Sequence, residues 1–261
     1  ELRERQRATL AAELPAPLAS RVHWLDALPE RFEGVVVGNE VLDAMPVRLV
    51  LRDATGWRER GVAVDAARAF VFEDRPLPEE PAGVSALAAL DALELPEGYL
   101  TEIHEAARAF TGTVCRMLAR GAAFFIDYGF PAGEYYHPQR AEGTLMCHYR
   151  HRAHGDPFVW PGLQDITAHV EFSGIHEAAV AAGAELLGYT SQGRFLLNAG
   201  ITEVLAGIDP ADGARFLPAA NAVQKLIAES EMGELFKVIA FGRGIDGGLA
   251  AFARGERSHA L

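Results

Sequence analysis

Two short apolar runs in this chain each end in a cluster of polar residues. Residues 34–38 are Gly-Val-Val-Val-Gly and lead into the cluster 39–43, and residues 122–126 are Ala-Ala-Phe-Phe-Ile and lead into 127–129. A short, continuously apolar run is typical of a strand that helices cover on both faces, as in parallel sheets. Because ligands in open α/β sheets bind beyond the carboxyl ends of the strands, we expect a functional site where these clusters lie.

The first cluster contains the strongest candidates for site residues. Asn39 and Glu40 end the apolar run, and Asp43 shares one face with Glu40 if a helical turn begins there. The alternative is that the cluster forms a turn and a helix cap, where Asn and Asp are common, although Glu is not a turn former. In the second cluster Asp127 is a further candidate. Tyr128 either belongs to the site or packs as an aromatic ring with a hydrogen-bonded hydroxyl.

Composition and charge narrow the class of protein. The chain has 261 residues, of which 49% are hydrophobic, and this is enough for a large core in one or two domains. Its net charge of -12 disfavours nucleic acid as a partner, because phosphate binding needs clustered Lys and Arg. The acidic surface either serves solubility alone or attracts a cationic substrate.

Signals for disulfides, membranes and export are weak. Cys115 and Cys147 form no C-x-x-C pair, which disfavours a disulfide framework or a cysteine zinc site. No apolar run approaches the roughly eighteen residues of a membrane span, and no signal peptide is apparent. The first residue is Glu1 and not Met, so we expect an upstream region to be missing from this sequence.

The order of predicted elements indicates an α/β protein with an antiparallel insertion. We expect an α/β core of residues 1–45 and 100–261, a β-meander insertion over 46–99 and a functional loop over 129–169 within the core. Apolar stretches on either side of a turn at 53–56 predict the meander. The predicted helices cover 2–13, 86–92, 101–120, 174–182 and 202–230, and the predicted strands of the core cover 22–24, 34–38, 122–126, 185–189 and 235–241.

The loop 129–169 contains residue types that bind zinc. These are His148, His151 and His154, with Cys147 and Asp156 nearby. Two arginines alternate with the histidines, and cations beside a dication are unfavourable. None of the usual zinc spacings fits, so we predict no metal site and expect a polar network that orders the loop.

The segment 164–169 has two interpretations. It either begins a helix, with Asp165 or Thr167 as the cap, or it turns Gln164, Asp165 and His169 toward the site. The chain contains no glycine-rich dinucleotide loop and no Walker loop. It also lacks a G-x-S-x-G elbow, which disfavours a serine hydrolase.

Several segments together closely resemble the MidA-type family of S-adenosylmethionine-dependent methyltransferases. The resemblance spans nearly the whole chain, and mitochondrial members of this family are regarded as protein arginine methyltransferases that assist the assembly of respiratory complex I. The matching segments are E-L-R-E-R-Q at 1–6, G-N-E-V-L-D-A-M-P-V at 38–47, F-I-D-Y-G at 125–129, E-Y-Y-H-P at 134–138, G-T-L at 143–145, C-H-Y-R-H-R at 147–152, D-P-F at 156–158 and P-G-L-Q-D-I-T-A-H-V at 161–170.

The resemblance implies a class I methyltransferase fold, which is a Rossmann-like sheet with helices on both faces, and S-adenosyl-L-methionine as cofactor. It places Leu25 and Asp26 beside the adenine, and Asn39 and Glu40 near the methionine moiety and the reacting methyl group. Family members begin with a strand, a glycine-rich cofactor loop and a second strand that ends in an acidic residue. We expect this chain to start just after that acidic residue and to lack the loop.

The resemblance further implies methylation of an arginine on a protein. Glu40 and Asp43 are then expected to bind the guanidinium group, because a carboxylate pair can hold two of its nitrogens. Asp127 is the alternative carboxylate for this role. A histidine is expected to accept the released proton, and His169 is the first choice, before His148 and His151. The residues expected to bind the substrate are Tyr128, His148, Arg150, His151, Gln164 and Asp165.

The expected partner is a protein substrate, with a respiratory-complex subunit as one candidate, and a homodimer is left open. No nucleic acid and no membrane span are expected. The resemblance implies a cytoplasmic location for bacterial-type members and a mitochondrial one for eukaryotic relatives. Two other functions stay open, namely a non-catalytic assembly factor that binds a partner through 129–169 and a metal-dependent hydrolase that uses the cluster from His148 to Asp156.

Overall fold

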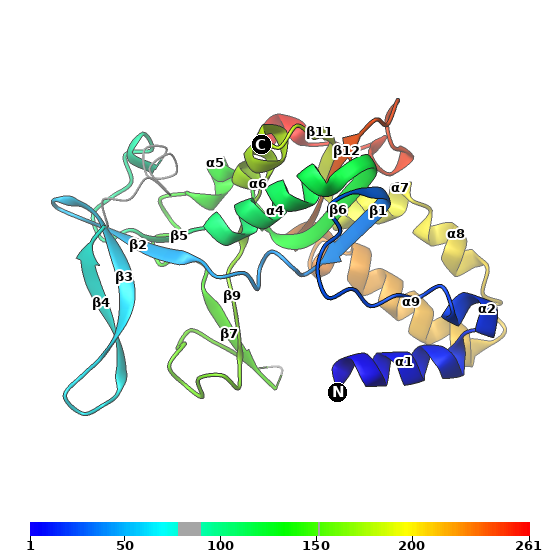
Figure 1. Cartoon of the computed structure of the whole chain (residues 1–261), viewed down its shortest axis with the longest axis horizontal. Helices are drawn as coiled ribbons and strands as arrows, with labels where there is room; N and C mark the ends of the chain where they lie inside the picture. The colour runs from blue at the N-terminus through cyan, green and yellow to red at the C-terminus, as the bar shows by residue number, and fades with distance from the viewer. Residues whose placement is uncertain (78–89, 151) are drawn as a thin grey trace.

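A mixed five-stranded sheet forms the centre of the molecule (Figure 1). The computed structural model describes residues 1–77, 90–150 and 152–261. The sheet has the order β1 (Phe32–Asn39), β6 (Leu118–Phe130), β12 (Phe236–Arg243) and β11 (Glu185–Ser191), with β10 (Val170–Glu171) beside the end of β6. β1 and β10 run parallel to β6, whereas β12 runs antiparallel to both β6 and β11. The predicted α/β class is therefore confirmed.

Helices cover both faces of the middle of this sheet. On one face, α4 (Glu105–Met117) and α6 (Phe172–Ala181) pack over a buried cluster that includes Phe125 and Ile239. On the other face, α7 (Gln192–Asn198) and η1 (Ala250–Phe252) cover Val238 and Ala240, with Phe124 packed beside them. The continuously apolar run at 122–126 thus has the environment that its sequence predicts.

β1 is covered on one face only, and the prediction of burial on both faces is wrong for this strand. Val36 packs against the α4 side of the sheet, whereas Val35 and Val37 are 62% and 65% exposed. The reason is position, because β1 lies at the end of the strand order and pairs with β6 alone among the described strands. The layer of α7 and η1 packs on β11 and β12 instead.

The segment after β1 forms a separate antiparallel sheet, seen in Figure 1 to one side of the central sheet. Its order is β4 (Phe70–Pro76), β3 (Gly56–Val64), β2 (Arg48–Asp53) and β5 (Leu100–Ile103). Asp53 Oδ1 accepts the N–H of Thr55 at 2.7 Å and so closes the β2–β3 turn. The meander that the sequence predicts is confirmed. The helix expected at 86–92 falls mainly on residues outside those that the structure describes.

The helix predicted at 101–120 is shorter than expected. α4 occupies only 105–117. Thr101 belongs to β5, where it pairs with Val50 of β2, and β6 begins at Leu118. The helical spacing of apolar residues extends beyond the helix on both sides, and pairing with β2 and β1 decides the ends. The strand predicted at 22–24 is also wrong, because Trp24 has no strand partner and instead donates to Gln6 Oε1 at 2.9 Å.

The remaining helices follow the predicted order closely. α1 (Leu2–Glu13) and α6 agree with the predictions to within two residues, and α8 (Ile201–Ala206) and α9 (Gly213–Ile227) lie in the predicted helical region. β11 and β12 agree with the two last predicted strands. The shorter helical elements are α2 (Ala16–Ala19), α5 (Ala132–Tyr135), α10 (Met232–Leu235) and η2 (Ser258–Ala260).

The stretch 129–169 is largely structured. It contains a small antiparallel sheet with the order β8 (Arg152–His154), β7 (Met146–Tyr149) and β9 (Asp165–Thr167). The helix considered at 164–169 does not form, because Asp165 pairs with His148 across β9 and β7. This sheet brings residues from both ends of the stretch together.

We predict that Gly129→Ala destabilises the fold by about 1–3 kcal/mol, because a Cβ there would lie 2.0 Å from the backbone oxygen of Val170 in the paired strand β10. Gly133→Ala is the control, because a Cβ at Gly133 meets nothing within 4 Å. Urea unfolding measures both. Equal unfolding free energies for the two variants would contradict the tight β6–β10 pairing.

Candidate functional site

A cavity of about 1090 Å³ lies beyond the carboxyl ends of β1 and β6. The segment 142–146 and β9 form one side of it, and Phe236 at the start of β12 forms part of another. The cavity brings together most of the residues that the sequence singles out. Those that line it are Glu40, Asp43, Tyr128, His148, Gln164, Asp165 and His169.

Asp127 fixes the segment that carries two of these carboxylates. Its Oδ2 accepts the backbone N–H groups of Val41, Leu42 and Asp43 at 3.2, 3.0 and 3.2 Å, and its Oδ1 accepts that of Tyr128 at 3.0 Å. The Asp127 side chain is buried and does not line the cavity. The geometry therefore favours a positioning role for Asp127 over contact with a ligand.

Asp43 lines the cavity, and most of its side chain is buried. Its Oδ2 accepts the Tyr128 hydroxyl at 2.5 Å, whereas its Oδ1 is buried and has no hydrogen-bond partner. Glu40 stands at the bend between β1 and this segment with φ 49°, a left-handed conformation that is uncommon for Glu. Asn39 Nδ2 donates to Glu40 Oε1 at 3.1 Å.

Burial shifts the ionisation of the groups around the cavity. Burial first, and the nearby Asp43 second, raise the pKa of Asp127 to about 7 against the opposing effect of the backbone N–H groups. Burial and the hydrogen bond to Asp43 raise the pKa of Tyr128, so its hydroxyl stays protonated and donates. Burial, with Arg140 and Lys237 nearby, lowers the pKa of His169 to about 4. His169 is therefore neutral at pH 7.

A second buried carboxylate, that of Glu102, holds the segment 142–146 on one side of the cavity. Glu102 Oε1 accepts the N–H groups of Thr144 and Leu145 at 2.6 and 3.0 Å, and Oε2 accepts the Tyr135 hydroxyl at 2.6 Å. The Thr144 hydroxyl in turn accepts the N–H of His169 at 3.0 Å. The sequence analysis missed this role because it placed residue 102 in the first turn of a helix. A signal was present in the G-T-L motif at 143–145, which forms this wall.

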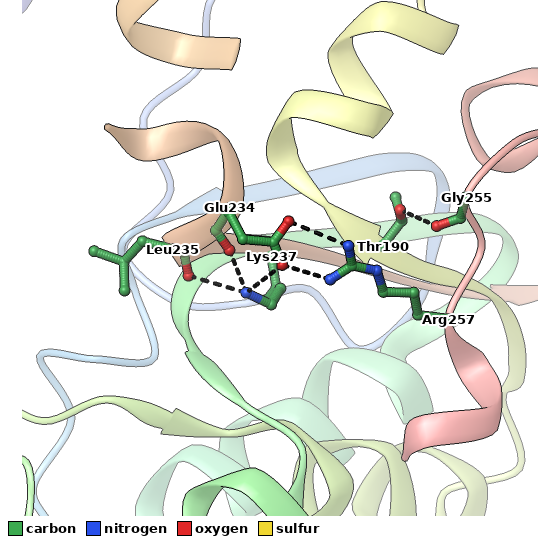
Figure 2. A network of polar contacts seen from close by, with 6 residues as sticks. All are labelled: Thr190, Glu234, Leu235, Lys237, Gly255 and Arg257. Carbon is green, nitrogen blue, oxygen red and sulfur yellow. Dashed lines mark hydrogen bonds and ion pairs between the residues drawn. The ribbon is translucent and has the colours of Figure 1, made fainter. Parts of the chain in front are cut away.

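The side of the cavity that Leu235 and Phe236 form is linked to Arg257 through an ion pair (Figure 2). Arg257 Nη1 and Nη2 contact the two carboxylate oxygens of Glu234 at 2.5 and 3.2 Å. The buried Lys237 Nζ donates to the carbonyl oxygens of Glu234 and Leu235. Leu235 and Phe236 line the cavity, so this network sets where that wall lies.

Several residues of the cavity lining carry buried polar atoms that have no hydrogen-bond partner among the described residues. Buried polar atoms in folded proteins are nearly always hydrogen-bonded, so this set is unusual. Among the described residues, four such atoms belong to side chains of the cavity lining. They are Asp43 Oδ1, Gln164 Oε1, Thr167 Oγ1 and His169 Nδ1.

Some residues that the sequence singled out lie elsewhere. Leu25 is exposed and Asp26 pairs with Arg3 at 2.7 Å, and neither lines the cavity. Arg150 follows strand β7, where its guanidinium lies 5.5 Å from the centre of the Tyr149 ring, and it is also outside the lining. His151 lies outside the described residues.

The histidine and cysteine residues of 147–156 do not gather around one point. Cys147 is buried and pairs with His154 across β7 and β8, whereas His148 is exposed on the cavity side. Within the described part of the chain, no group of three His, Cys, Asp or Glu side chains is arranged to hold a metal ion. In the same residues, no helix is both long and apolar enough to cross a membrane.

One protein family matches most of the chain. The family is described as "Putative S-adenosyl-L-methionine-dependent methyltransferase", and its sequence model matches residues 1–190. The mitochondrial protein arginine methyltransferase NDUFAF7 of Danio rerio is 29% identical over 82% of this chain and 48% of its own length. Its counterpart in Mus musculus is 30% identical over 69% of this chain and 39% of its own length. The chain thus spans less than half the length of these relatives.

Solved structures agree with the fold. A Burkholderia thailandensis protein bound to S-adenosyl-homocysteine is 74% identical and superposes with a TM-score of 0.95, over 100% of this chain and 66% of that chain. A native crystal structure from the same organism has the same identity and TM-score and is covered over 68% of its chain.

We predict that Asp127→Ala lowers the free energy of unfolding by roughly 2–4 kcal/mol, because four backbone N–H groups lose their acceptor in a buried place. Amide hydrogen exchange should accelerate at residues 41–43. Asp26→Ala is the control, because its surface ion pair with Arg3 contributes about 0–1 kcal/mol. Unchanged exchange at 41–43 in Asp127→Ala would contradict the positioning role.

The raised pKa of Asp127 also predicts how stability depends on pH. The folded pKa of about 7 exceeds the value of about 3.9 for an unfolded Asp, so the folded state binds the extra proton between these values. Its stabilising effect is complete below about pH 4 and is lost as the pH rises through about 7, with a slope of up to about 1.4 kcal/mol per pH unit. Asp127→Asn should flatten this fall in urea titrations from pH 5 to pH 8. A difference between wild type and Asp127→Asn that does not vary with pH would disprove the shift.

Proposed function

We propose that the chain methylates arginine on a protein substrate. The premise is that the chain belongs to the family of S-adenosyl-L-methionine-dependent methyltransferases. The observation that carries the proposal is the pairing of Glu40 and Asp43 in one polar cavity at the carboxyl end of β1. The name of the mitochondrial relatives, protein arginine methyltransferase, supports the choice of acceptor.

The residues of the cavity suit the proposed cofactor, S-adenosyl-L-methionine. The amine and hydroxyl groups of this cofactor need hydrogen-bond acceptors, and the side-chain oxygen of Gln164 in the lining is one. When bound, the cofactor supplies a methyl group on a positively charged sulfur. Asn39 and Glu40 are the proposed holders of its methionine end. Leu25 and Asp26 remain the proposed neighbours of the adenine.

The acidic lining suits a guanidinium acceptor. Glu40, Asp43, Glu142 and Asp165 line the cavity, against a single arginine, Arg140. A guanidinium stays protonated in water, so it is attracted to these carboxylates. The Asp43 carboxylate is the proposed acceptor of one N–H group and Glu40 of another, which leaves the third nitrogen to face the methyl group. Positioning of this kind accounts for a large part of the rate of a bimolecular transfer.

The rest of the site keeps these groups in place and removes a proton. Tyr128 donates to Asp43 Oδ2 and so fixes the orientation of this carboxylate, while Asp127 holds the backbone beneath. His169 was the first choice as proton acceptor, but its pKa of about 4 makes it a poor base at neutral pH. We therefore assign proton removal to His148, which is exposed and lines the cavity.

The proposal covers partners only in outline. A protein substrate follows from the proposed acceptor, and a respiratory-complex subunit, a homodimer and a cytoplasmic location stay predictions from the sequence. The non-catalytic assembly factor remains the alternative. It would be favoured if the protein bound its partner but transferred no methyl group.

We predict that Glu40→Gln and Asp43→Asn each reduce methyl transfer by about 100-fold or more, because each removes one arm of the guanidinium contact. Transfer is measured with isotopically labelled S-adenosyl-L-methionine and an arginine peptide, followed by analysis for methylarginine. Circular dichroism should show a retained fold.

Glu142→Gln is the matched control, because it removes one charge from the same cavity without touching the proposed contact. We expect it to change transfer by less than about tenfold, the scale of a single screened charge. Undiminished methylation by Glu40→Gln would refute the assignment of Glu40.

A further inference from the structure

A second hollow adjoins the candidate active cavity. This apolar groove has a volume of about 470 Å³ and lies between the antiparallel sheet β2–β4 and the segment 157–161. Val62, Phe70 and Phe72 line it from the sheet, and Phe158 lines it from the opposite segment. The Phe72 and Phe158 rings lie 4.7 Å apart between centroids, so the two sides are in contact at one end.

The groove and the cavity share part of their lining. Leu145 and Ile166 line both, and each comes from an element that also contributes polar residues to the cavity. Leu145 follows Thr144 on the wall that Glu102 fixes, and Ile166 lies in β9 between Asp165 and Thr167. A ligand that extends out of the cavity past these two side chains would reach the groove.

The charges along the groove are already paired with each other. Arg48 contacts Glu59 at 3.0 Å and Glu105 at 3.1 Å, and Arg60 contacts Asp74 at 2.8 Å. These pairs leave little net charge to attract a polar ligand. The apolar side chains, by contrast, stay open to solvent, with Val62 59% exposed. The groove thus suits an apolar occupant, whereas the cavity suits a cationic one.

We propose that the apolar groove binds an aliphatic or aromatic side chain of the protein substrate, a few residues from the arginine that enters the cavity. This inference rests on the proposed function, because it assigns the groove to the substrate of that reaction. An extended peptide advances about 3.3 Å per residue, so a segment that places arginine in the cavity reaches the adjoining groove within a few residues. The enzyme then selects arginines that have an apolar neighbour.

The test uses fluorescein-labelled Gly/Ser peptides that contain one arginine. In one series a single phenylalanine is moved through every other position of the peptide, and binding is followed by fluorescence anisotropy. We expect phenylalanine at one or two adjacent positions to tighten binding by about tenfold, which is the scale of burying part of an aromatic ring. Equal binding of all the peptides would overturn the inference.

Two variants of β3 locate the effect. Val62→Gln should abolish the gain from phenylalanine, because Val62 lines the groove. Val64→Gln should keep the gain, because Val64 is 60% exposed in the same strand but lies outside the groove. Both substitutions are on the surface, so neither should prevent folding. Loss of the gain in both variants, or in neither, would overturn the inference.

A second peptide series replaces the arginine by glutamine while keeping the phenylalanine. Weaker binding of these peptides supports both the proposed acceptor and the groove. Unchanged binding that still depends on phenylalanine and on Val62 would leave the groove assigned and would contradict arginine as the acceptor. Failure of the groove and failure of the proposed function are thereby told apart.

Discussion

The candidate site depends on the set of backbone hydrogen bonds that the Asp127 carboxylate accepts. Three come from residues 41–43 and one from Tyr128, so the end of β6 fixes the chain that follows β1. Glu40 and Asp43 belong to this bend, and their direction follows from that constraint rather than from a helix or strand of their own. Together with the Glu40 N–H bond to the Ile126 carbonyl oxygen at 2.9 Å, it offsets the cost of the left-handed conformation of Glu40.

The other walls of the cavity follow the same principle. Glu102 accepts N–H groups from 144–145, and Glu234 joins the turn before β12 to Arg257 near the C-terminus. The carboxylates of Asp127 and Glu102 thus hold backbone N–H groups, the Glu234 carboxylate holds the Arg257 side chain, and Glu40 and Asp43 line the cavity. Part of the acidic character of the chain is therefore structural. Glu40, Asp43, Glu142 and Asp165 give the cavity the negative charge that the proposed cationic acceptor needs.

Local patterns in the sequence were enough to predict the strands β1, β6, β11 and β12 and the cluster of polar residues at the ends of the first two. They were not enough to predict β5, because Thr101 and Glu102 continue a helical pattern and only pairing with β2 makes them a strand. Glu102 was missed for the same reason, since its partners lie more than thirty residues along the chain. Long-range contacts of this kind leave no periodic signal.

The central claim is that Glu40 and Asp43 bind the guanidinium group of an arginine next to the cofactor. The most direct test is a crystal structure of the protein with S-adenosyl-homocysteine and an arginine peptide. The account predicts guanidinium nitrogens within hydrogen-bond distance of Asp43 Oδ1 and of the Glu40 carboxylate, with one nitrogen facing the cofactor sulfur. An arginine bound outside the cavity, with Asp43 Oδ1 still unpartnered, would contradict it.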